Sequence, residues 1–458
     1  MRTWSVYEFS RLYKSNITKY EGDHLNLEHS QFEALKQLLT CSEADHDKLF
    51  RYGFEKRQEV LVCQNYVGVI CLPCGDQIEI LPKTHRKSVN TESDESISWN
   101  RSNLIKMLKA TQYLPGKVAD NASLDMAKMP LLDVFIQLFL QEISLLIKRG
   151  VARQYETHES NEPFIKGRIL VSQQIRHNLV NKHHHFIAFD ELTTNRPENR
   201  LIKSALLWSL KRVTAKTQHL CRELLFHFEE VTSSKAIWQD LNAWQRGRHL
   251  SHYEAIRPWI EMIFKDQSPT SINGSKSMLS ILFPMERVFE DYVPICLKKQ
   301  FQNYDIKTQT SSQYLISHKP NDNKKRPNNG KLFQLKPDLH IQAENKLIIG
   351  DTKWKVIDES LPNKKYGISE GDIYQMLAYN QTYQKGEFEP AVIWLIFPMT
   401  PQFLKPLPDF IFENGLTLKV LPFDIDSSVL KLMDRNIISD TLDGPVIKNE
   451  KDCLINEF

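Results

Sequence analysis

One stretch of the sequence, residues 331–355, strongly limits how the C-terminal part of this chain can fold. It reads KLFQLKPDLHIQAENKLIIGDTKWK. Two runs rich in apolar and β-branched residues, 333–341 and 346–355, flank a polar turn at 343–345. This pattern predicts two antiparallel strands joined by a tight turn.

Three ionisable side chains belong to this predicted hairpin. Asp351 and Lys353 are two residues apart on the second strand, so both side chains should leave the same face of the sheet. Asp338 lies on the first strand, and we expect the register to bring it alongside them. Two carboxylates and one ammonium would then converge at the end of a half-buried sheet.

This combination is suited to phosphodiester hydrolysis. Carboxylate oxygens are preferred ligands of Mg²⁺, which neutralises charge on the phosphate and orients the attacking water. We therefore expect Asp338 and Asp351 to hold Mg²⁺, and Lys353 to stabilise or help form the hydroxide and to contact the phosphate. A hairpin with solvated charges is the alternative, because a D-x-K triplet alone is common.

A helix is predicted after the turn at Gly367–Gly371. Asp372, Gln375 and Tyr379 are spaced i, i+3 and i+7, so they share one helical face. Packing of that face against the sheet and a role at the site are compatible readings. Residues 394–398 (WLIFP) follow as an apolar strand that continues the sheet.

These motifs together resemble a known nuclease signature. Pro337-Asp338, Asp351-Thr352-Lys353 and Gln375-x-x-x-Tyr379 are similar to the RecB-like members of the PD-(D/E)XK superfamily. The resemblance implies a restriction-endonuclease-like α/β/α core. It also implies that Gln375 and Tyr379 orient the lysine or contact the scissile strand.

A further acidic residue comes from an upstream helix, predicted over 285–299 after Pro284. Pro294 within it predicts a kink or an early end. In the superfamily a first helix often contributes one more acidic residue near the metal, and the match here is Glu290. A glutamate that simply faces solvent is an equal alternative.

The length of 458 residues allows two or three domains. The net charge of +3 is too small to indicate nucleic-acid binding by itself. Local basic clusters, Lys324-Lys325-Arg326 and Lys364-Lys365, can follow a phosphate backbone or can be solvated surface. Cys71-x-x-Cys74 has no second pair at zinc spacing, and His183-His184-His185 is expected in a solvated loop.

No apolar run is long enough to span a bilayer, and the N-terminal MRTWSVYEFSRLYK has no signal-peptide hydrophobic region. The seven scattered cysteines do not indicate a disulfide framework. A cytoplasmic protein without a membrane segment is expected.

Residues 1–125 are predicted to form a β-rich domain. Strands are expected at 60–64, 66–72 and 77–83, and the alternation within 77–81 is typical of a half-exposed antiparallel strand. The polar residues 87–103 are predicted to be a surface loop.

Residues 126–270 are predicted to be a helical middle region. Its clearest helices are 131–149, which a glycine follows, and 199–210. The nuclease domain is then expected over 271–458. The predicted fold class is α/β multidomain.

The order of landmarks along the chain resembles one family within the superfamily. Motifs at 66–70, 78–83, 148–150 and 199–203, followed by Phe289-Glu290 and the nuclease core, are similar to McrC, the nuclease subunit of McrBC-type modification-dependent restriction systems. The resemblance implies a Mg²⁺-dependent DNA endonuclease that works with a hexameric AAA+ GTPase, McrB. It implies that the N-terminal part docks on this partner and stimulates its GTP hydrolysis.

The absence of a GxxxxGK[ST] motif agrees with a nucleotide site on a partner. Two alternatives differ in class. One is a stand-alone RecB-like DNA repair nuclease, and the other is a regulatory subunit of an AAA+ complex.

Overall fold

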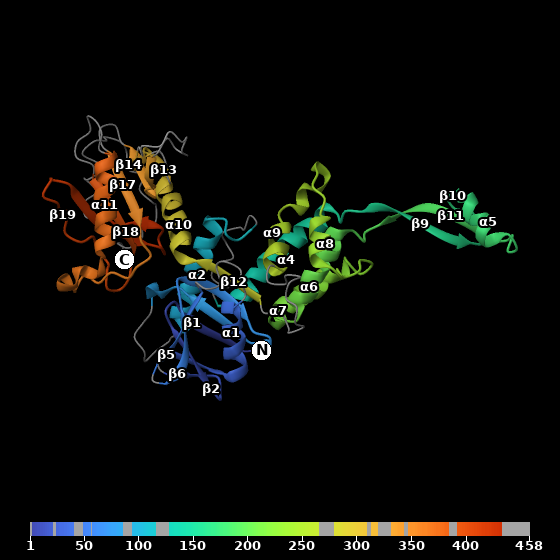
Figure 1. Cartoon of the computed structure of the whole chain (residues 1–458), viewed down its shortest axis with the longest axis horizontal. Helices are drawn as coiled ribbons and strands as arrows, with labels where there is room; N and C mark the ends of the chain where they lie inside the picture. Colours follow the sequence, from blue (N-terminus) through green and yellow to red (C-terminus); the bar gives the residue numbers. More distant parts are fainter. Residues whose placement is uncertain are drawn as a thin grey trace, which may run out of the picture. The chain divides into compact units, whose positions relative to one another are not determined.

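The computed structural model describes residues 2–21, 24–40, 49–55, 57–85, 94–115, 128–264, 279–308, 313–318, 331–342, 347–383 and 392–432. The chain divides into two compact units, Met1–Val288 and Phe289–Phe458 (Figure 1). None of the helices within the described ranges combines the length and apolar character needed to cross a membrane.

The N-terminal unit begins with a five-stranded sheet in the order β3-β4-β2-β6-β5. Helix α1 (His29–Thr40) packs on it through Phe32 and Leu35, which belong to the same buried core as Leu12, Leu25 and Leu61. The strands are β2 (Arg11–Ser15), β3 (Lys19–Glu21), β4 (His24–Glu28), β5 (Phe50–Glu55) and β6 (Gln58–Cys63).

A four-stranded sheet follows in the order β1-β8-β7-β12. Its strands are β1 (Thr3–Tyr7), β7 (Tyr66–Cys71), β8 (Gln77–Leu81) and β12 (Leu279–Pro284). The prediction of a half-exposed strand at 77–81 was wrong, because every residue of β8 is buried. Glu79 is buried as an ion-paired carboxylate, 2.6 Å from Arg101, and not as a solvated residue.

The prediction of a surface loop over 87–103 was also wrong from residue 94 onwards. Helix α2 (Asp94–Ala110) occupies this stretch, and residues 86–93 lie outside the described ranges. Its buried face includes the polar Asn100 and Asn103 together with Leu104 and Leu108. The segment 87–103 is polar, and most apolar residues of α2 come after residue 103, so the segment by itself did not indicate a helix.

Strand β12 shows how the unit closes. It pairs antiparallel with β7, and Gly68 of β7 lies so close to it that a Cβ there would be 2.0 Å from the Ile281 carbonyl oxygen. Residues 279–284, placed by the sequence within 271–458, therefore belong to a sheet of the N-terminal unit.

The helical part of this unit contains α4 (Leu131–Arg149) and α6 (Pro197–Leu210), as predicted. It also contains α7 (Ala215–Phe226), α8 (Ile237–Asn242), η4 (Arg248–Tyr253) and α9 (Arg257–Phe264). An arm built on a three-stranded sheet, in the order β10-β11-β9, projects from these helices (Figure 1). The arm consists of β9 (Gln154–Glu162), β10 (Arg168–Ile169), α5 (Val171–Asn178) and β11 (His185–Thr193).

The arm was not predicted, because its strands carry polar side chains on both faces and lack the alternation of a half-buried sheet. Its base is fixed by buried hydrogen bonds. Asn199 donates to the carbonyls of Ala152 (3.0 Å) and Thr194 (2.7 Å), at the two ends of the arm, and accepts from Tyr253 (2.7 Å).

The C-terminal unit is built on a seven-stranded sheet with the path β13-β16-β17-β18-β20-β19 and with β21 paired to β20. Strands β17, β18 and β20 are parallel, and the other pairings are antiparallel. The bounds are β13 (Asp305–Thr308), β16 (Leu339–Gln342), β17 (Leu347–Thr352), β18 (Val392–Pro398), β19 (Phe410–Ile411), β20 (Thr417–Asp424) and β21 (Val429–Leu430).

Helices cover both faces of this sheet. Helix α11 (Glu370–Tyr383) packs through Met376 and Tyr379 on the face that carries Ile393 and Leu395. The alternate residues of the strands face the other way, toward α10 (Met285–Gln300). On that face the Phe289 ring lies 5.2 Å from the Trp354 ring. The unit is therefore a three-layered α/β/α arrangement.

The predicted hairpin is present in modified form. The first strand is divided at Lys336-Pro337-Asp338 into β15 (Lys331–Leu335), which pairs with β14 (Gln313–Ser317), and β16, which pairs with β17. A proline cannot donate to a strand ladder, which explains the break. The predicted turn at 343–345 lies outside the described residues, and the second strand ends at Thr352.

Two helix predictions in this unit can also be compared with the structure. Helix α11 is confirmed, with η6 (Pro362–Gly367) before it. The early end predicted at Pro294 was wrong, since α10 continues to Gln300.

Candidate active site

The two predicted metal-binding carboxylates lie side by side at one end of the β16–β17 pair. Leu339 is opposite Gly350, the last pair of the β16–β17 ladder, so Asp338 directly before β16 and Asp351 directly after this pair lie at the same level. Asp338 is 8% exposed and Asp351 is 2% exposed. The apolar residues of β16 and β17 place these strands in the core of the unit. The carboxylates at the end of the strands are therefore buried as well.

Thr352 holds Asp338 in place. Its backbone N–H and its Oγ1 both donate to Asp338 Oδ2, each at 2.7 Å. The sequence analysis did not assign a role to Thr352. Alternation along the strand predicts only that its side chain leaves the opposite face from those of Asp351 and Lys353, so no sequence signal pointed to the contact with Asp338.

Lys353 forms an ion pair with Asp351, with Nζ 2.5 Å from Oδ2. Asp351 Oδ2 is buried and accepts no hydrogen bond of normal geometry from the described residues. The Lys353 backbone N–H donates to the Ile396 carbonyl oxygen at 2.9 Å, which keeps the chain beside β18 after β17 has ended. The shared direction predicted for the two side chains is thus observed.

Gln375 and Tyr379 reach the same carboxylate from α11. Gln375 Nε2 and Tyr379 OH both donate to Asp351 Oδ1 at 3.3 Å, and Gln375 Nε2 also donates to Tyr379 OH at 2.7 Å. Tyr379 OH additionally donates to the Lys336 carbonyl oxygen at 3.1 Å. The predicted helical face therefore orients Asp351, and the contact to Lys353 is indirect.

The third residue of that face, Asp372, has a different task. It accepts from Lys355 Nζ at 2.7 Å and from Ser369 Oγ at 2.7 Å. Ser369 and Asp372 also bond each other's backbone N–H groups, which is a capping box at the start of α11. Lys355 thereby ties the residues after β17 to the helix that carries Gln375. The sequence signal for this capping box is the S-x-x-D pattern before the helix, which was not among the predicted motifs.

Glu290 of α10 lies next to Asp338. Its negative charge is one of the causes that raise the pKa of Asp338. Helix α10 thus places a third acidic residue, Glu290, next to Asp338 at the site.

Burial and mutual repulsion control the charge of these groups. Burial, together with the negative charge of Asp338, raises the pKa of Asp351 to about 7 despite the opposing effect of Lys353. Burial and the charge of Glu290 likewise raise the pKa of Asp338, and the bonds from Thr352 oppose this. Burial alone would lower the pKa of Lys353, but Asp351 raises it overall, so Lys353 is a stable ammonium.

The site can be compared with what Mg²⁺ requires. Its donors are oxygens of buried carboxylates, and one of them, Asp351 Oδ2, lacks a normal hydrogen bond. Among the described residues, no three His, Cys, Asp or Glu side chains are arranged as a ready set of metal ligands. Asp338 and Asp351 fit a hard cation, whereas ligation by Glu290 stays a prediction.

The other sequence signals lie away from these carboxylates. Cys71 is buried and Cys74 is exposed, and both thiols are free. His183 and His184 lie between α5 and β11, and His185 is the first residue of β11 and not part of the expected loop. Lys324 to Arg326 are outside the described residues, and Lys365 pairs with Glu370 at 2.6 Å.

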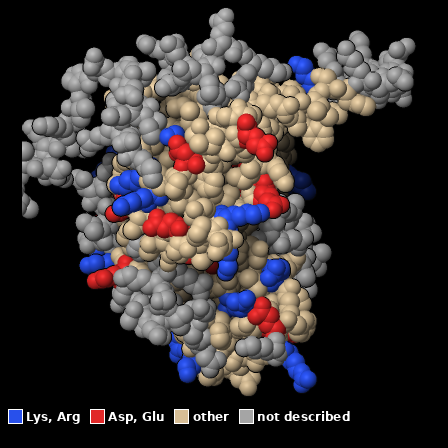
Figure 2. All heavy atoms as spheres, turned by 90° about the vertical axis from the view of Figure 1, so that its left-hand side faces the viewer, with Lys and Arg blue, Asp and Glu red and all other residues tan. Residues whose placement is uncertain are grey.

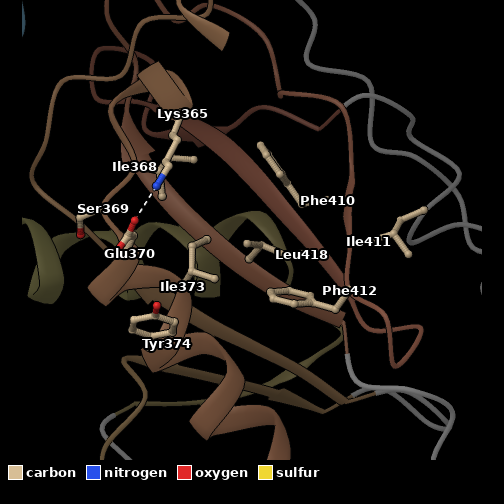
Figure 3. A pocket seen from close by; sticks show the side chains of 10 residues that line it. All are labelled: Lys365, Ile368, Ser369, Glu370, Ile373, Tyr374, Phe410, Ile411, Phe412 and Leu418. Carbon is tan, nitrogen blue, oxygen red and sulfur yellow. Dashed lines mark hydrogen bonds and ion pairs between the residues drawn. The ribbon is translucent and has the colours of Figure 1, made fainter. Parts of the chain in front are cut away.

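A cavity of about 360 Å³ lies beside the first turn of α11 (Figure 3). The rings of Tyr374, Phe410 and Phe412 line it, together with Ile373 and Leu418. Neither Asp338, Asp351 nor Lys353 lines it. This apolar cavity is therefore separate from the carboxylate site.

Comparison with known proteins adds to this geometry. A family profile described as "McrBC 5-methylcytosine restriction system component" matches residues 61–398. The chain belongs to this McrBC family. The matched range contains all the predicted site residues, and it confirms the McrBC-type identification made from the sequence. No curated protein matches the chain.

Two solved structures are similar to the McrBC-family chain. One is the refined half-complex from a tetradecameric assembly of Thermococcus gammatolerans McrB AAA+ hexamers with bound McrC, at 18% identity and a TM-score of 0.64, covering 92% of this chain and 94% of that one. The other is the cryo-EM structure of the Thermococcus gammatolerans McrBC complex, at 19% identity and a TM-score of 0.46, covering 65% of this chain and 88% of that one. At these identities the first similarity shows a shared fold.

Proposed function

We propose that this chain is the DNA-cleaving subunit of a McrBC-type restriction system and that its C-terminal unit is a PD-(D/E)XK nuclease. The observation that carries the proposal is the buried Asp338, Asp351 and Lys353 group within a chain of this family. The three-layered core agrees with a restriction-endonuclease-like fold. The substrate proposed is modified DNA of the methylcytosine type.

Each residue has a role in the proposed hydrolysis. Asp338 and Asp351 would hold Mg²⁺, which when bound neutralises charge on the scissile phosphate and lowers the pKa of a water. Thr352 fixes the rotamer of Asp338, and Gln375 and Tyr379 fix that of Asp351. Lys353 supplies a positive charge at the position where the phosphate and the attacking oxygen would lie. Lys353 would act there as a cation and a hydrogen-bond donor.

We further propose a hexameric AAA+ GTPase of the McrB type as the partner, with GTP hydrolysis stimulated by this chain. The first solved assembly contains McrC bound to McrB AAA+ hexamers, which supports this partner. The sequence itself has no phosphate-binding loop motif. The surface of this chain is only weakly charged, which agrees with a partner that brings the DNA to the site. On the face seen in Figure 2, Lys and Arg side chains alternate with Asp and Glu among the described residues, without one continuous basic surface.

The proposal is tested with methylated and unmethylated plasmid, the AAA+ protein encoded beside this chain, GTP and Mg²⁺. We expect cleavage of the methylated plasmid only when all components are present, and a GTPase rate that rises when this chain is added. Cleavage without partner or GTP would instead favour a stand-alone repair nuclease. Stimulated GTP hydrolysis with no cleavage would favour a regulatory subunit.

A further inference from the structure

The β14–β15 hairpin of the C-terminal unit exposes apolar side chains that the site described above does not use. Leu315, Ile316 and Leu332 are 41%, 46% and 44% exposed, and Phe333 is 68% exposed. Ile316 and Leu332 are opposite each other in the ladder. A two-stranded hairpin with apolar residues turned to solvent is unstable on its own, so such a surface usually marks a contact.

Phe333 is the most unusual residue of this hairpin. Its backbone has φ 57°, in the left-handed region that a bulky residue rarely adopts. The register places it opposite Leu315, but the paired positions pass from Leu332 to Gln334, so the ladder is interrupted at Phe333. Glycine would relieve the strain, so a phenylalanine here indicates that its side chain is required.

The hairpin is joined rigidly to the catalytic carboxylates. The Tyr379 hydroxyl, which bonds Asp351, also bonds the carbonyl of Lys336 at 3.1 Å. The Tyr383 hydroxyl bonds the carbonyl of Leu335 at 3.4 Å. Phe333 is five residues before Asp338, so their Cα atoms are at most about 17 Å apart. This is about five base-pair steps of duplex DNA, within one bound substrate.

The charge of the hairpin suits a polyanion. Lys331 lies at the start of β15 and Lys336 directly after its end. Among the described residues 313–318 and 331–336 there are two lysines and no Asp or Glu, whereas the complete chain is nearly neutral. Positive charge next to exposed apolar side chains favours a nucleic acid over an apolar protein surface, because the phosphates attract the lysines while the bases accept an apolar wedge.

We propose that the β14–β15 hairpin binds the DNA substrate and that Phe333 is a positioning residue, inserted between adjacent base pairs beside the scissile phosphate. The inserted ring unstacks one step and bends the duplex, which places the phosphate over Asp338 and Asp351. Lys331 and Lys336 contact the flanking phosphates. This inference rests on the proposed function, since it assumes that DNA is cut at these carboxylates.

The test uses the full chain with its AAA+ partner and a short methylated duplex carrying a fluorophore at each end, in Ca²⁺ to follow binding and in Mg²⁺ to follow cleavage. For the wild type we expect end-to-end energy transfer to rise on binding, because the duplex bends. Phe333→Ala should lose this rise, bind DNA about tenfold more weakly and cut correspondingly more slowly. Phe333→Trp should retain bending.

Two further variants separate this role from a structural one. Phe333→Gly removes the ring and the backbone strain together, so it should lose bending while its melting temperature stays at or above the wild-type value. Phe226→Ala on α7 removes an equally exposed ring, 72% exposed, and should change neither bending nor cleavage.

The outcomes distinguish this inference from the proposed function. If the wild-type complex neither binds nor cuts DNA, the proposed function fails. If the wild type cuts and Phe333→Ala bends and cuts DNA equally well, only the wedge is refuted. If Phe333→Ala changes the oligomeric state of the chain in the absence of DNA, measured by sedimentation, the hairpin is an interface between copies and the proposal is overturned.

Discussion

Replacing Asp338 by Asn should stabilise the metal-free protein at neutral and alkaline pH. Burial, together with the negative charge of Glu290, raises the pKa of Asp338 from 3.8 to about 7. Asparagine has nearly the same shape and can accept the two 2.7 Å hydrogen bonds from Thr352, but it carries no charge. The change therefore removes the repulsion and keeps the fold of the site.

The size and the pH range of the effect follow from linkage. The folded state binds more protons than the unfolded state between pH about 4 and 7, so the contribution of Asp338 to stability is fully present below its unfolded pKa of 3.8 and is lost as pH rises through the folded value. At about 1.4 kcal/mol for each tenfold change in the ionisation equilibrium, the upper limit is about 4 kcal/mol. The charge of Asp338 also raises the pKa of Asp351, and we expect Asp338→Asn to recover about 2 kcal/mol, roughly half of this limit.

The assay is thermal unfolding in EDTA at pH 5, 6, 7 and 8, followed by near-ultraviolet circular dichroism, to which the buried Trp354 and Trp394 contribute. We expect Asp338→Asn to melt about 4–8 °C above the wild type at pH 8, with a difference that shrinks toward pH 5. The exposed-carboxylate control Asp409→Asn should stay within about 0.5 kcal/mol of the wild type. A difference that does not depend on pH, or a destabilised Asp338→Asn, would refute the reasoning.

Three other predictions concern positions that support the fold and the site. Tyr379→Phe removes one hydrogen bond to Asp351, so single-turnover cleavage should slow about tenfold with the fold retained, and a rate within twofold of the wild type would contradict this. Asn199→Ala leaves the Ala152 carbonyl and the Tyr253 hydroxyl at the base of the arm without their Asn199 partner, and urea unfolding should show a loss of about 2–3 kcal/mol. Gly68→Ala should lose at least about 3 kcal/mol or fail to fold, because its Cβ would clash with β12, whereas Gly75→Ala, with open space around it, should cost about 1 kcal/mol of backbone strain.

The sequence was most informative where a residue pattern and its chemistry coincide. Alternation along a strand predicted that Asp351 and Lys353 share a direction, and the structure places Lys353 Nζ 2.5 Å from Asp351. Helical spacing predicted the common face of Gln375 and Tyr379, and both reach the same carboxylate oxygen. Such features depend only on the spacing of residues along one strand or helix, so they can be predicted without knowledge of the fold.

Features that depend on distant partners were not predictable in this way. Buried polar strands such as β8 look half-exposed until Arg101, a residue of a separate helix, is known to neutralise Glu79. The arm carries polar side chains on both faces, so no alternation of apolar and polar residues indicated its strands. The break at Pro337 was visible in the sequence, yet only the pairing of β15 with β14 shows that the chain leaves the main sheet there.

The most direct test of the account compares DNA cleavage by wild type, Asp351→Ala and Asp358→Ala in the complete system of partner, GTP, Mg²⁺ and methylated plasmid. Asp351 is buried beside Lys353, whereas Asp358 is only half-buried and its side chain bonds only to Ser360 among the described residues. We expect Asp351→Ala to abolish cleavage while stimulation of the partner GTPase continues, and Asp358→Ala to cut like the wild type. Cleavage that survives in Asp351→Ala would place the active site elsewhere and contradict the account.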